Sequence, residues 1–176
     1  FRTRAILEQQ RKMGWETVHV TSSKHTAESS ETEIVDGFQF YRTQASAGFL
    51  HQLSIMNQYD VVSTLTKRLN QVIEIENPDI LHAHSPSLNG MAALKAGKTH
   101  NIPVVYECRA FWEDAAVDHG TSKEGGARYQ LTRFLETRVF QQADAVTTIC
   151  DGLKRDIIAR GIAAEKITVI PNAVDI

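Results

Sequence analysis

The stretch that decides the fold class is residues 79–108, DILHAHSPSLNGMAALKAGKTHNIPVVYEC. It contains two short, mainly apolar runs, Asp79–Ala83 and Val104–Cys108, of the length and composition typical of buried strands. Between them, Leu88–Lys98 is rich in small and helix-forming residues. A strand, a helix and a second strand in this order predict a βαβ unit with two parallel strands.

The same alternation continues on both sides of this unit. Further strands are predicted at residues 17–21, 38–43, 145–149 and 167–170, and further helices at residues 1–13, 57–76, 127–142 and 153–160. The polar residues between the first two strands are expected to lie outside the core, and residues 109–126 are expected to form a loop. The sequence therefore predicts an α/β fold, a Rossmann-like parallel sheet with helices on both faces, whose ligands bind at the carboxyl ends of the strands.

Composition excludes several classes of protein. The chain has 176 residues, is 42% hydrophobic and carries a net charge of −2 with both signs interspersed, so we expect one globular domain, or at most two small ones, and no nucleic-acid partner. No apolar run has the roughly 20 residues of a transmembrane segment. Cys108 and Cys150 lie far apart without metal-binding spacing, which favours reduced thiols and a cytoplasmic location.

Two histidines stand at the end of the Asp79–Ala83 strand. His82 and His84 are two residues apart, so both imidazoles lie on one face of a strand and could bind a metal. A metallohydrolase would need further ligands, and no second metal-binding motif is present, although His119 and Asp118 could be brought in by folding. We expect no metal, a structural His82, and a substrate-binding role for His84 and the following Ser85.

Charged and aromatic residues gather after the Val104–Cys108 strand. Glu107 and Arg109 are the candidate catalytic residues, because they flank the point where that strand leaves the sheet. Phe111, Trp112 and Asp114 are expected to bind substrate, since aromatic faces beside carboxylates suit a sugar. The alternative is a surface loop whose aromatic side chain is anchored in the core.

Four motifs along the chain resemble family 4 retaining glycosyltransferases of the GT-B fold. They are PDILHAH (residues 78–84), IPVVY (102–106), ADAVTTI (143–149) and KITVIPNAVD (166–175). The last is the most specific, because the family's usual K-I-x-V-I-P-N-G-V-D lies at the junction of its two Rossmann-like domains. Residues 105–120, VYECRAFWEDAAVDHG, resemble a branch associated with bacterial exopolysaccharide and exosortase loci.

The resemblance implies how the chain is organised. Residues 1–170 would be the N-terminal, acceptor-side domain without its first strand, and residues 171–176 the start of the interdomain linker. A C-terminal donor-binding domain would follow and is absent here. The resemblance also places Asn172 of the junction motif among the substrate-binding residues. Arg109 and Ala110 depart from the usual histidine or aspartate, which leaves a direct role of Arg109 in transfer open.

The function implied is sugar transfer with retention from a nucleotide sugar to a glycan or lipid-linked acceptor, without a bound metal. It would serve bacterial polysaccharide synthesis in the cytoplasm, at the inner face of the membrane. This chain alone is expected to be inactive and to self-associate through unpaired strands. Three alternatives stay open: a non-catalytic glycan-binding module, a GT-B nucleotide-sugar epimerase with a full set of acid/base groups in its cleft, and the metallohydrolase.

Overall fold

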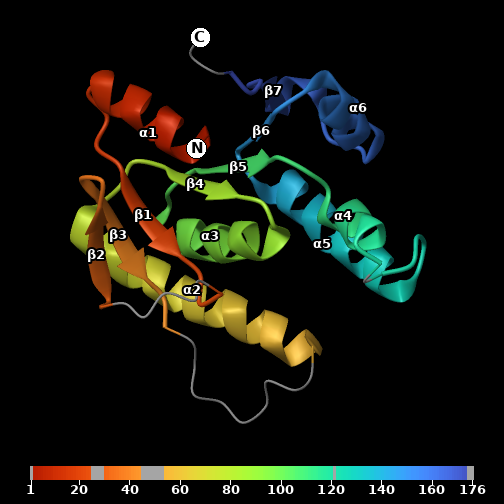
Figure 1. Ribbon diagram of the computed structural model, residues 1–176, viewed down its shortest axis with the longest axis horizontal. Helices are drawn as coiled ribbons and strands as arrows, with labels where there is room; N and C mark the ends of the chain where they lie inside the picture. Colours follow the sequence, from red (N-terminus) through yellow and green to blue (C-terminus); the bar gives the residue numbers. More distant parts are fainter. Residues whose placement is uncertain (1, 25–29, 45–53, 121, 174–176) are drawn as a thin grey trace. The chain divides into compact units, whose positions relative to one another are not determined.

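The computed structural model describes residues 2–24, 30–44, 54–120 and 122–173 (Figure 1). The chain divides into two compact units, Phe1–Glu76 and Asn77–Ile176. Each unit has its own sheet. That residues 1–170 form one acceptor-side domain stays a prediction.

The first unit combines two helices with a three-stranded sheet. Its elements are α1 (Arg2–Lys12), β1 (Val18–Thr21), β2 (Thr32–Val35), β3 (Phe38–Arg42) and α2 (Ser54–Glu76). The strand order is β1-β3-β2, in which β1 runs parallel to β3 and β2 antiparallel. The buried apolar side chains include Phe38 and Tyr41 of β3 and the apolar stripe of α2, which comprises Val61, Val62, Leu65, Val72 and Ile73. The helical periodicity of this stripe is confirmed.

The strand β2 was missed by the sequence prediction. It lies at the sheet edge and is largely exposed, so it lacks the apolar run that marks a buried strand. Asp36 and Gly37 connect it to β3 with φ angles of 52° and 77°. Positive φ at both central residues is the geometry of a type I′ hairpin turn, for which Asp-Gly is a preferred pair. This dipeptide was the signal in the sequence that could have found the hairpin.

The second unit holds the predicted βαβ stretch within a four-stranded parallel sheet, order β4-β5-β6-β7. Its elements are β4 (Leu81–His84), α3 (Ser87–His100), β5 (Val104–Cys108), α4 (Trp112–Asp118), α5 (Ala127–Gln142), β6 (Ala145–Thr148), α6 (Asp151–Ala159), the short 3₁₀ helix η1 (Ala164–Lys166) and β7 (Ile167–Val169). Helix α3 packs on β4 and β5, and α6 packs on β6 and β7. A parallel sheet flanked by helices confirms the predicted α/β class (Figure 1).

The segment after β5 is not the loop expected from the sequence, because it contains helix α4. Glu113 and Asp114 lie in the first turn of this helix, where negative charge interacts favourably with the helix dipole. Seven residues are too few for the apolar periodicity on which the longer helices were recognised. The helix packs against α5.

Helix α3 approaches the sheet and α5 very closely at Gly90. A Cβ atom at this position would lie 2.5 Å from Cγ1 of Val139 and 2.9 Å from Cε2 of Tyr106. Both neighbours are buried and fixed by their own packing. The small residues of α3 thus set its distance from β5.

We expect the substitution Gly90→Ala to lower the free energy of unfolding by about 1–3 kcal/mol, because the added methyl group overpacks this contact. Urea unfolding of both proteins measures the difference. Gly152→Ala is the matched control, since its Cβ would make an ordinary contact of 3.7 Å with Sγ of Cys150. A Gly90→Ala protein as stable as this control would show that α3 can move away at little cost.

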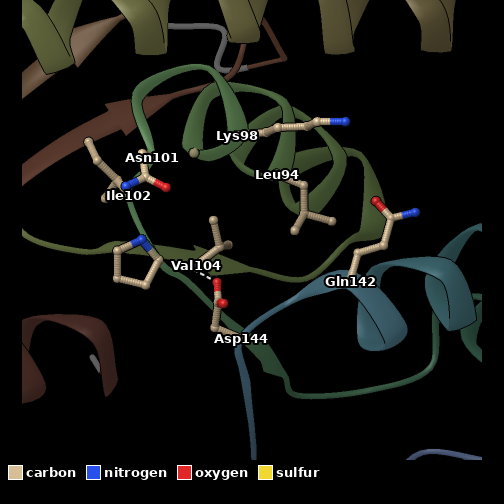
Figure 2. A pocket seen from close by; sticks show the side chains of 9 residues that line it. Leu94, Lys98, Asn101, Ile102, Val104, Gln142 and Asp144 are labelled. Carbon is tan, nitrogen blue, oxygen red and sulfur yellow. Dashed lines mark hydrogen bonds between the residues drawn. The ribbon is translucent and has the colours of Figure 1, made fainter.

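An open pocket of about 680 Å³ lies at the amino end of β5 (Figure 2). Asp144 stands at its edge and accepts a hydrogen bond of 2.7 Å from the backbone N–H of Val104. The pocket is lined by Leu94, Gly97, Lys98, Asn101, Ile102, Pro103, Val104, Gln142 and Asp144. Since Val104 begins β5 and Glu107 lies near its other end, the pocket is separate from the strand ends where ligands bind in such sheets.

Candidate functional site

Strands β4 and β5 bring the predicted site residues together at their carboxyl ends. The two strands are parallel, and His84 is the register partner of Glu107. His82 lies two residues before His84, so its ring is on the same face, with 4.6 Å between the ring centroids. Three polar side chains that are up to 25 residues apart in the sequence therefore lie on one face of the sheet, at the carboxyl ends of β4 and β5.

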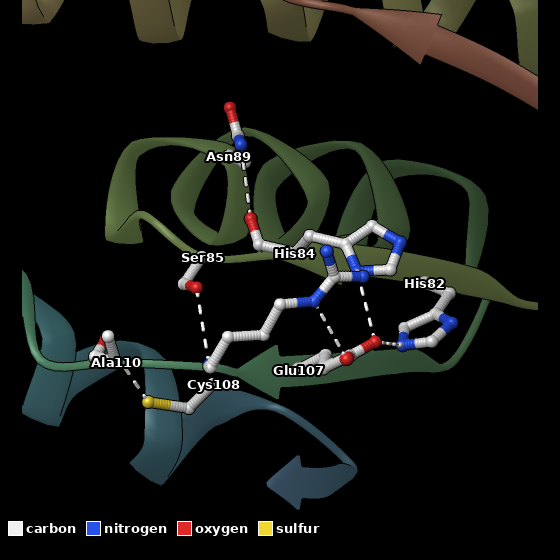
Figure 3. A network of polar contacts seen from close by, with 8 residues as sticks. His82, His84, Ser85, Asn89, Glu107, Cys108 and Ala110 are labelled. Atoms are coloured by element: carbon white, nitrogen blue, oxygen red, sulfur yellow. Dashed lines mark hydrogen bonds and ion pairs between the residues drawn. The ribbon is translucent and has the colours of Figure 1, made fainter. Parts of the chain in front are cut away.

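Glu107 is the centre of this group (Figure 3). Its Oε2 lies 3.0 Å from Nδ1 of His84 and 3.4 Å from Nε2 of His82, and its Oε1 accepts a hydrogen bond of 2.9 Å from Nε of Arg109. The Glu107 side chain is only 3% exposed, whereas the other three are each about a third exposed. We call His82, His84, Glu107 and Arg109 the Glu107 cluster.

The carboxyl group of Glu107 is ionised in this environment. Burial by itself raises its pKa, but the hydrogen bonds from His82, His84 and Arg109 together outweigh burial and hold the pKa well below its ordinary value. The cluster therefore presents a fixed negative charge under three groups that can donate hydrogen bonds.

Nδ1 of His84 is shared between two neighbours. Nη2 of Arg109 lies 3.0 Å from it, as does Oε2 of Glu107. Nδ1 can donate a hydrogen to Glu107 or accept one from Arg109, but one ring nitrogen cannot do both. When Nδ1 carries the hydrogen, Nε2 of the neutral ring holds the lone pair and can accept a proton from a hydroxyl group.

The expectation that the His82 side chain is packed is wrong, and its structural role stays a prediction. Its side chain is 33% exposed and lies within 3.4 Å of Glu107, so it belongs to the Glu107 cluster. It was misread because its partner stands on the next strand, and single-sequence spacing does not reveal strand register. Within the described part of the chain, His82, His84 and Glu107 form the one group of three side chains with the donor atoms and spacing to hold a metal ion.

Ser85 also lies in the site. Its backbone N–H donates to the carbonyl of Glu107 at 2.9 Å, and its Oγ lies 3.4 Å from the backbone nitrogen of Arg109. Asn89 fixes the end of the same strand, because its side-chain amide donates to the carbonyl of His84 at 3.0 Å (Figure 3). These contacts hold the β4 and β5 ends side by side.

The other predicted substrate-binding residues lie in different surroundings. Phe111 is buried, and its ring packs 3.7 Å from the guanidinium of Arg160, so it is the aromatic anchor that the sequence left open as an alternative. Trp112 is 47% exposed, and the carboxylate of Asp114 accepts a hydrogen bond of 2.9 Å from the hydroxyl of Tyr129. Asn172 is exposed beyond β7. Their roles in binding stay predictions.

A buried polar network below this segment was not anticipated. Nη2 of Arg160 lies 2.7 Å from Oε1 of Glu113, and the two side chains are 5% and 0% exposed. Beside them, the hydroxyl of Tyr106 donates to Oε1 of Glu136 at 2.7 Å, and burial raises the pKa of Glu136 to about 7. The network links α4, α5 and α6 to β5, so it fixes the start of α4. No motif marks it, since its members come from four separate elements.

A comparison with known protein families gives a match over most of the chain. Residues 1–173 match the family described as "Glycosyl transferase 4-like domain". A search of curated proteins finds no match. Among the helices in the described ranges, none combines the length and apolar character that a membrane span requires.

Solved structures with a similar fold include proteins described as UDP-N-acetylglucosamine 2-epimerases. Those from Listeria monocytogenes, Methanocaldococcus jannaschii and Rickettsia bellii share 20%, 14% and 15% sequence identity with the chain, at TM-scores of 0.49, 0.48 and 0.46. Each alignment covers 73% of this chain but only 29%, 30% and 29% of the respective solved structure. The chain thus spans less than a third of these proteins. The match over residues 1–173 shows that the chain belongs to the glycosyl transferase 4-like domain family.

Proposed function

We propose that this chain provides the acceptor-side wall of an enzyme that transfers a sugar, with retention, from a nucleotide sugar to a glycan or lipid-linked acceptor. The observation that carries the proposal is the Glu107 cluster, a buried carboxylate that holds His84 and Arg109 at the carboxyl ends of parallel strands. Ligands of parallel α/β sheets bind at this edge. Bacterial polysaccharide synthesis at the inner face of the membrane is the proposed setting.

The cluster has the groups that an acceptor site needs. Glu107 orients His84, whose Nε2 can accept the proton of the attacking hydroxyl group, and it orients Arg109, a side chain of the type that binds oxygens of a sugar or phosphate. The guanidinium of Arg109, oriented by Glu107, is proposed to donate hydrogen bonds to the leaving diphosphate. Ser85, Trp112, Asp114 and Asn172 are proposed to contact the substrates around it. No metal is needed for these steps.

A stripe on α5 supports the part of the proposal that concerns a lipid-linked acceptor. Arg128, Leu131, Phe134 and Arg138 recur at helical spacing and are all exposed. Exposed apolar side chains between arginines suit the interface of an anionic membrane, where the arginines contact headgroups and the apolar side chains enter the acyl boundary.

The test is transfer by the full-length enzyme. We expect Glu107→Gln and His84→Asn each to lower kcat/KM by about tenfold to a hundredfold, because His84→Asn removes the group that accepts the proton and Glu107→Gln removes the charge that orients it. His119→Asn is the matched control, since His119 is exposed at the end of α4. Transfer that is equal in all three variants would place the acceptor elsewhere.

A nucleotide-sugar epimerase is the second candidate, and the Glu107 cluster is the observation that favours it. Two imidazoles beside an ionised carboxylate supply acid/base groups that an epimerase needs. The same enzyme preparation distinguishes the two candidates when it is incubated with a nucleotide sugar in D₂O without acceptor. Deuterium exchange at a sugar carbon supports the epimerase. Absence of exchange, together with release of nucleotide in a second incubation to which acceptor is added, supports the transferase.

A further inference from the structure

We propose that His82, His84 and Glu107 form a binding site for a divalent transition-metal ion, with Zn²⁺ as the best match. This goes beyond the proposed function, because transfer as proposed uses these side chains without an ion. The ligand atoms are Nε2 of His82, Nδ1 of His84 and Oε2 of Glu107. Two imidazole nitrogens and one carboxylate oxygen are a donor set that zinc accepts readily.

The spacing of these atoms suits a tetrahedral ion. Zinc bonds of about 2.0–2.1 Å imply neighbouring ligand atoms about 3.3 Å apart in a tetrahedral site. Oε2 of Glu107 lies 3.4 Å from the His82 nitrogen and 3.0 Å from the His84 nitrogen. All three atoms lie within 4.8 Å of one another, so small rotations of the two rings bring them to the required separation.

Burial and access also suit an ion. The Glu107 carboxylate is 3% exposed and therefore fixed, whereas the two histidine side chains are 33% and 35% exposed. An ion bound between them would be accessible to solvent, and its fourth coordination position would be open to water.

Arg109 is the competitor for this position. Its Nη2 lies 3.0 Å from Nδ1 of His84, the nitrogen that would bind the ion. A guanidinium and a divalent cation cannot both occupy this point, because their charges repel at that distance. Since the Arg109 side chain is 31% exposed, its end can move into solvent when an ion arrives. The site thus holds either the arginine or the metal.

The experiment is calorimetric titration of the chelator-treated full-length protein with ZnCl₂, with Co²⁺ absorption as a second readout of tetrahedral ligation. We expect His82→Asn, His84→Asn and Glu107→Gln each to remove one bound ion per chain or to weaken it at least tenfold. Arg109→Gln is expected to tighten binding several-fold, because the competing charge is gone. His119→Asn and Cys150→Ser are the controls, since both side chains are exposed and outside the cluster.

The proposal is overturned if wild type and Arg109→Gln both fail to bind the ion, or if the three ligand variants bind as wild type does. Circular dichroism of each variant separates loss of binding from loss of folding, and Arg109→Gln tests the site without removing a ligand. Transfer activity is assayed separately with chelator present. Activity without zinc binding contradicts only the metal site, and zinc binding without activity contradicts only the proposed function.

Discussion

Replacing Arg160 with methionine is expected to lower the free energy of unfolding by about 3–5 kcal/mol, because it leaves a buried carboxylate without its cation. Arg160 is the ion-pair partner of Glu113, and the Glu113 side chain has no exposed surface. Neither oxygen of Glu113 has a hydrogen bond of regular geometry among the described residues, so the attraction of Arg160 is its main compensation. Methionine preserves much of the volume packed over Phe111 but carries no charge.

Urea unfolding measures this loss, with Arg155→Met on the exposed side of α6 as the matched control. The double variant Arg160→Met/Glu113→Gln is expected to recover part of the stability, since it removes both charges of the pair. An Arg160→Met protein as stable as Arg155→Met would show that Glu113 is compensated in some other way.

A second large effect is expected in the pH dependence of stability. The pKa of Glu136 is about 7 in the folded protein, against an ordinary value of 4.5, mainly because the side chain is buried and secondarily because Glu113 is near. The folded state therefore binds a proton that the unfolded state releases between these two values. The stability contributed by neutral Glu136 is complete below about pH 4.5 and is lost as the pH rises through 7.

Glu136→Gln stays neutral at every pH, and its amide oxygen can still accept the hydrogen bond from Tyr106. We expect the wild-type free energy of unfolding to fall relative to this variant by roughly 2–3 kcal/mol between pH 5 and pH 8. Urea unfolding across this range checks the prediction, with the exposed Glu165→Gln as control. Parallel pH profiles for wild type and Glu136→Gln would mean that Glu136 is ionised throughout.

Much of the fold could be predicted because its longer elements have clear patterns. The boundaries of β5 and α5 are those expected. Strand β5 is an apolar run that follows a proline, and α5 is a helix of 16 residues, and both are strong signals in a sequence. The strand β2 was missed because an exposed edge strand has no apolar run, and α4 because seven residues are too short to show a period.

The candidate site was predictable only in part. Glu107, Arg109 and His84 follow from the rule that parallel strands gather their carboxyl ends, and the structure places them in contact. The contribution of His82 depends on strand register, which the sequence does not display. The burial of Phe111 under Arg160 depends on a helix that begins about 40 residues later.

The pairing of His84 with Glu107 also bears on how the chain avoids misfolding. A slip of one residue between β4 and β5 would turn every side chain of one strand to the opposite face. Glu107 would then exchange places with Tyr106, which packs against α3 and α5 near Gly90. The ionised carboxylate would then be buried near the carboxyl group of Glu136, whereas in the correct register it meets two imidazoles and a guanidinium. The polar residues at this edge thus penalise wrong strand pairing before any substrate is bound.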